Sequence, residues 1–96
     1  MPIFVHLCKG TPEGFKTLKD LPGRWTDVKK RVQEAGGKIL GAYALMGRYD
    51  YLLITDLPDV KAALSGVLKT AMKGTVTFET LGALPLDEFV KLVKEL

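Results

Sequence analysis

Two apolar runs in the middle of the chain alternate like β-strands, and a short polar turn separates them. The runs cover residues 38–46 and 51–55, and the turn consists of Gly47, Arg48, Tyr49 and Asp50. Two strand-like runs joined by a turn that contains glycine are typical of a β-hairpin. We therefore predict a hairpin at this point, with the glycine supplying backbone freedom at the bend.

Helical patterns lie on both sides of the hairpin. Upstream, Thr11 is a fair N-cap before Pro12, Pro22 breaks or kinks the segment, and a second helical piece ends at Gly36. Downstream, apolar residues recur at spacings of three and four, at Val60, Ala63, Leu64, Val67, Leu68, Ala71 and Met72. A final helix is predicted to begin at Pro85.

Residues 2–8 and 75–81 complete the pattern as a first and a last strand. The order is then β, α, β, β, α, β with a terminal helix, which is typical of the ferredoxin-like α+β fold. We expect four antiparallel strands, with the first and third at the centre and the two main helices on one face. The 96 residues are too few for more than one domain, so residues 1–96 are predicted to form a single domain.

The predicted strands are apolar on both faces. In the first, Ile3, Val5 and Leu7 alternate with Phe4, His6 and Cys8; in the second, Ile39, Tyr43 and Leu45 with Leu40, Ala42, Ala44 and Met46; in the third, Leu52 and Ile54 with Tyr51 and Leu53. A bare face of such a sheet exposes on the order of several hundred Å², the size that marks an interface. The terminal helix is too short to cover it all, so we predict a homodimer or a higher even-numbered assembly.

Composition and charge narrow the function further. The chain carries one cysteine, no signal-like segment and no apolar run of membrane-spanning length, so we expect a cytoplasmic protein that does not bind membranes. The net charge is +3, and the densest basic group is interleaved with acids: Arg24, Asp27, Lys29, Lys30, Arg31 and Glu34. This mixture is typical of a solvated helix face, and RNA-stacking aromatics are missing, so no specific nucleic-acid binding is predicted.

Several of these residues carry a resemblance to a known family. Gly47, Tyr49 and Asp50 match the naming motif of the GYD domain family, with Arg48 at its variable position. The match runs essentially end to end and includes Gly36-Gly37-Lys38, Gly82 and Asp87-Glu88-Phe89. The resemblance implies a dimeric α+β barrel. It implies no particular reaction; similar barrels include cofactor-free monooxygenases and isomerases, by analogy of fold only.

His6 is the only histidine and is one candidate site residue. It has the pKa range of a general base, but a polar group in a central strand more often bonds to a neighbour. Cys8 lies on the same strand face roughly 7 Å away, too far for a nucleophile and base pair. A structural role for His6 is therefore favoured.

Arg48, Tyr49 and Asp50 are the other candidates. A turn carboxylate usually accepts backbone hydrogen bonds, and a tyrosine beside it usually packs its ring. The alternative is that Tyr49 and Asp50 orient a small polar ligand beneath the helices. No set of residues has metal-ligand spacing, and no glycine-rich phosphate loop precedes a helix, so no metal and no cofactor is predicted.

With so few candidate polar residues, two function classes remain. The favoured one is a non-catalytic module that binds a small molecule or a partner. The alternative is a cofactor-free enzyme, monooxygenase-like or isomerase-like, acting on a small substrate. A buried pocket lined by His6 or Tyr49 with perturbed pKa values favours the enzyme, and a filled core beneath the helices favours the module.

Overall fold

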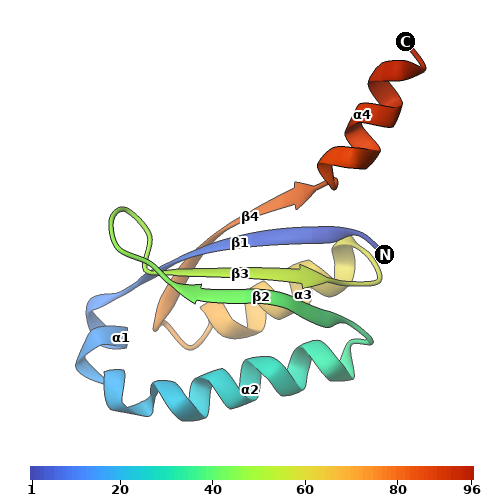
Figure 1. Cartoon of the computed structure of the whole chain (residues 1–96). Coiled ribbons are helices and arrows are strands. Elements are labelled where there is room, and N and C mark those ends of the chain that lie inside the picture. Colours follow the sequence, from blue (N-terminus) through green and yellow to red (C-terminus); the bar gives the residue numbers. More distant parts are fainter.

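The computed structural model describes all 96 residues and shows a four-stranded antiparallel sheet with strand order β2-β3-β1-β4 (Figure 1). The elements are β1 (Ile3–Gly10), α1 (Pro12–Lys16), a 3-10 turn (Leu18–Asp20), α2 (Leu21–Glu34), β2 (Lys38–Ala44), β3 (Tyr51–Asp56), α3 (Val60–Ala71), β4 (Val76–Ala83) and α4 (Leu86–Lys94). Helices α2 and α3 lie on one face of the sheet. The predicted ferredoxin-like α+β fold is confirmed.

The helix ends lie where local chemistry places them. Thr11 Oγ1 accepts a hydrogen bond from the backbone N–H of Gly14 at 3.0 Å and caps α1. Asp59 caps α3 in the same way, and its Oδ1 accepts from a backbone N–H at 2.8 Å. Pro22 lies in the first turn of α2, where it costs no helical hydrogen bond, and Gly36 follows α2 with a φ of 79°.

The strand pairing shows which side chains face the helices. Phe4 pairs with Thr55 and His6 with Leu53, so these residues share the helix-side face of the sheet. In β2 the expected alternation is wrong, because the register shifts between Ile39 and Gly41. This bulge puts Ile39 on the helix side, opposite Thr55, rather than on the face of Tyr43.

The connection between β2 and β3 is longer than predicted. The strands end at Ala44 and resume at Tyr51, so Leu45 and Met46 belong to the loop. The Leu45 N–H donates to the Asp50 carbonyl at 2.8 Å and closes the loop at its base. Gly47 has a φ of 109°, a conformation that side chains rarely adopt, which explains the glycine at this position.

The filled core of this chain is small. Phe4, Leu57 and Ala63 form the buried apolar cluster, and Val32 and Ala62 pack against it. From the sequence, the terminal helix could have covered part of the open face of the sheet. In the structure, α4 does not cover this face. It continues past the end of β4 and projects away from the sheet (Figure 1). Large apolar surfaces are therefore left without a partner inside the chain.

Candidate functional site

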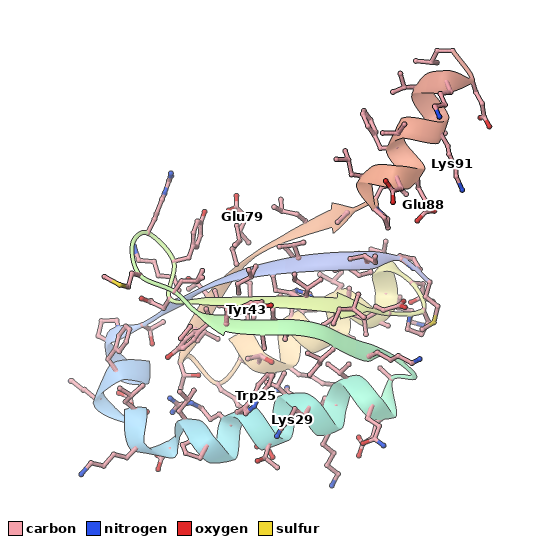
Figure 2. All side chains as sticks on the ribbon, in the orientation of Figure 1. Trp25, Lys29, Tyr43, Glu79, Glu88 and Lys91 are labelled. Carbon is pink, nitrogen blue, oxygen red and sulfur yellow. The ribbon has the colours of Figure 1, made fainter.

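A cavity of about 770 Å³ lies between α2, α3 and the helix-side face of the sheet. Its walls are mostly apolar, with Trp25 and Val28 from α2, Val67 from α3, and Leu53 and Phe78 from the sheet. Figure 2 shows Trp25 between α2 and the sheet. The space beneath the helices is therefore a pocket lined by His6, which was the sign expected of an enzyme, and not the filled core expected of a non-catalytic module.

His6 lies on the floor of this cavity and is only 4% exposed. Its Nδ1 is 3.0 Å from the Thr80 hydroxyl, and its Nε2 is 2.9 Å from the Thr55 hydroxyl. Burial lowers the pKa of His6 below its usual value, because the protein interior solvates the imidazolium poorly. His6 is therefore a neutral imidazole, with both ring nitrogens bonded to threonines.

Cys8 lies two residues further along β1 and also lines the cavity. Its thiol is directed at the His6 carbonyl oxygen at 3.8 Å rather than at the imidazole ring. Burial raises the pKa of the Cys8 thiol to about 11, so the thiolate is scarce at neutral pH. Cys8 and His6 do not form a nucleophile and base pair.

The loop residues Asp50, Tyr49 and Arg48 lie elsewhere. The Asp50 carboxylate accepts a hydrogen bond from the Gly10 N–H at 2.8 Å and ties the loop to the end of β1. The Tyr49 hydroxyl donates to the Glu79 carboxylate, and this bond raises the pKa of Tyr49. Glu79 extends from β4 on the side of the sheet away from α2 and α3 (Figure 2), and Arg48 is exposed.

These candidate residues do not converge on one point. His6 faces the cavity, Asp50 holds the end of β1, and Tyr49 meets a residue of the open sheet face. Sequence reasoning missed the two threonines that hold His6, because Thr55 and Thr80 are 49 and 74 residues away from it in the chain. A central-strand histidine with threonines in two other strands is the signal that could have suggested them.

A second feature is the open face of the sheet. Its centre is made of half-buried Ile3, Val5, Leu7, Leu52 and Ile54, with Leu81 46% exposed at its β4 side. No helix of the chain covers this face (Figure 1). The predicted bare apolar face is therefore present in the structure.

Two helix faces are also exposed and apolar. Helix α4 exposes large apolar side chains, namely Leu86, Phe89, Val90, Leu92 and Val93. On α3 and its C-cap residue, four large residues at spacings of four are more than half exposed: Val60, Leu64, Leu68 and Met72. We call these four the α3 stripe. A shallow groove lies over its Leu64, Leu68 and Met72, and Lys61 and Lys69 contribute to the walls of the groove.

The chemical inventory includes no metal centre, because no three His, Cys, Asp or Glu side chains are grouped to hold an ion. None of the helices combines the length and the apolar character that a membrane crossing requires.

Comparisons with known proteins give three findings. The family model of the GYD domain matches residues 4–93. A Thermus thermophilus protein named glutamine synthetase and cystathionine beta-lyase binding protein is 28% identical over 95 residues, which are 98% of this chain and 100% of that protein. The crystal structure of the leucine response regulatory protein of Mycobacterium tuberculosis is similar in fold, with a TM-score of 0.56, 11% identity and 88% of this chain covered. The match spans about half, 51%, of that longer chain.

Proposed function

We propose that this chain, which belongs to the GYD domain family, is a single-domain interaction module that assembles with copies of itself and holds other proteins. The observation that carries the proposal is the amount of bare apolar surface, on the open sheet face, on α4 and on the α3 stripe. Apolar surfaces of this extent mark interfaces. The name of the Thermus thermophilus relative supports the same class, since that protein is described as binding two enzymes.

Self-assembly places two open sheet faces against each other, which gives a dimeric α+β barrel. The strands have six to eight residues, so the four-stranded face covers roughly 400 Å² from strand spacing and rise. A stable interface buries about 800 Å² on each partner. The sheet alone falls short of this area, and α4 is the apolar element that projects from the sheet to supply the rest. In the proposed homodimer each α4 packs against the other copy.

The α3 stripe remains outside such a dimer, because α3 lies on the opposite face of the sheet. We assign it to a partner protein. An exposed row at spacings of four suits an amphipathic helix laid along the groove, and Lys61 and Lys69 favour a partner helix with acidic edges. Glutamine synthetase and cystathionine beta-lyase from the organism of this chain are the probes to use, since the Thermus thermophilus relative is named for binding these two enzymes.

Three substitutions of exposed apolar residues by glutamate separate the two surfaces. Phe89→Glu on α4 is expected to give monomers by light scattering, and Leu68→Glu on the α3 stripe is expected to keep the dimer but lose the enzymes in calorimetric titrations. Met46→Glu in the loop is the matched control and keeps both properties. A parent chain that is monomeric at micromolar concentration contradicts the self-assembly. A parent that binds neither enzyme contradicts the docking role.

One observation favours an enzyme as a second candidate, namely the cavity with neutral His6 on its floor. A general base must reach the proton that it abstracts. Both nitrogens of His6 are already bonded to threonines, and the Cys8 thiol is protonated at neutral pH. A cofactor-free reaction would need a threonine bond to break first, so we place binding ahead of catalysis.

A further inference from the structure

We propose that the cavity beneath α2 and α3 binds a small apolar organic acid, with a ring in the cavity and one carboxylate at its edge. The cavity lies on the sheet side of α3 and the docking groove on the outer side, with Lys69 bordering both, and the inference does not depend on the docking role.

The cavity follows from the sizes of the side chains around it. Three of the six α3 residues that line it are alanine or glycine, namely Ala62, Ala63 and Gly66, while the large residues of the α3 stripe are exposed. The lining residues of β2 include Ala42 and Ala44, which are also small. Protein interiors are close-packed, with few voids larger than a water molecule. A volume of about 770 Å³ lies instead in the range of ligand pockets.

The walls indicate what would fill this volume. Trp25, Tyr51 and Phe78 bring aromatic rings from α2, β3 and β4 to its lining. The polar groups of the floor, His6 and Thr55, are bonded to each other at 2.9 Å. The floor therefore offers no free charge, and an apolar ring is the group that suits it.

The charged residues of the lining indicate that the other end of the ligand is an anionic group. Four cationic side chains line the cavity, Arg24, Arg31, Lys69 and Lys73, against a single acid, Glu34. Arg24 is engaged with the backbone carbonyls of Thr17 and Gly14, and Lys73 lies 3.7 Å from the Asp27 carboxylate. Arg31 and Lys69 form no ion pair within the chain. An arginine without a partner is suited to a carboxylate, which it can bind with two parallel hydrogen bonds.

The test uses 3-phenylpropionate and its uncharged counterpart, 3-phenyl-1-propanol, in calorimetric titrations. The parent is expected to bind the acid saturably, with one site per chain, and the alcohol at least about tenfold more weakly. Trp25, the only tryptophan, lines the cavity, so its fluorescence should change along the same binding curve.

Gly66→Leu is the cavity-filling variant. Gly66 lines the cavity, and a Cβ added there meets no atom within 4 Å, so a larger side chain at this position is expected to occupy cavity volume. Gly23→Leu is the matched control, since Gly23 is also helical and unobstructed but lies outside the cavity lining. We expect Gly66→Leu to weaken binding of the acid at least about tenfold and Gly23→Leu to bind like the parent.

Arg31→Gln tests the charge, and its result does not depend on whether Gly66→Leu folds. It should weaken binding of the acid several-fold and leave binding of the alcohol unchanged. No saturable binding of the acid up to millimolar concentration overturns the proposal. So does equal binding by the parent and a folded Gly66→Leu protein, which would place the probe on an exposed apolar surface. Equal affinity of Arg31→Gln and the parent for the acid overturns the assignment of the carboxylate.

Discussion

Replacing Asp50 by alanine should destabilise this fold, because its carboxylate joins two segments that are distant in sequence. Asp50 Oδ2 accepts from the Gly10 N–H at 2.8 Å, while the Asp50 N–H donates to the Cys8 carbonyl at 2.8 Å. The backbone bond survives the substitution, so only the carboxylate contact is lost. Hydrogen bonds to charged groups contribute about 1.5–3 kcal/mol to the free energy of unfolding.

A domain of this size loses about 4–8 °C in its melting midpoint per kcal/mol, so Asp50→Ala should melt roughly 6–24 °C below the parent. Thermal unfolding followed by circular dichroism measures this, at one protein concentration because the proposed assembly would make the midpoint concentration-dependent. Asp50→Asn keeps a neutral acceptor and should recover about half of the loss. Arg48→Ala is the control and should change little, since that side chain is exposed. An Asp50→Ala protein that melts with the parent refutes a structural role for the carboxylate.

Further outcomes follow from single residues. Gly14→Ala places a Cβ against the carbonyl oxygen of Thr75, so it should lower the free energy of unfolding by about 1–3 kcal/mol in denaturant melts, whereas Gly23→Ala should not. The pKa of His6 is lowered from 6.5, so the unfolded chain binds its proton first; stability should fall as pH drops below about 6.5, and His6→Gln should flatten that part of the curve. Cys8, with a thiol pKa of about 11, should react slowly with iodoacetamide at pH 7 and rapidly after unfolding in guanidinium. Mixed-sequence DNA should show no binding that survives physiological salt.

The parts of the fold that sequence predicted are those with local causes. The predicted cap at Thr11 forms within three residues of its partner, and the left-handed conformation of Gly36, at the predicted end of α2, concerns one residue. The bulge that shifts Ile39 to the helix side was not predicted, because an unbroken apolar alternation fits either register. The same holds for α4, whose sequence pattern predicts a helix but carries no information on where that helix packs.

For the candidate site, the sequence indicated roles for single residues but not the partners that they contact. The structural role of His6 was favoured from its place in a central strand, and the structure supplies the two threonines that fit such a role. These contacts depend on the pairing of three strands, which no local pattern specifies. Asp50 was expected to stabilise its own turn, whereas its carboxylate bonds to Gly10, 40 residues away. A backbone N–H was the expected kind of donor, and its position in the chain could come only from the tertiary structure.

Helix α3 borders both proposed binding surfaces, the cavity on one side and the α3 stripe on the other. The sizes of its side chains account for both surfaces. An amphipathic helix usually turns its large apolar residues to the core. Here Ala63 is buried and Gly66 lines the cavity, while Leu64 and Leu68 are more than half exposed. If the small residues on the cavity side and the large residues of the α3 stripe changed places, the cavity would be filled and the α3 stripe would be lost. More apolar area would then be removed from water. A chain selected for stability alone has no reason to keep the present arrangement. The arrangement is explained if both the cavity and the α3 stripe have occupants.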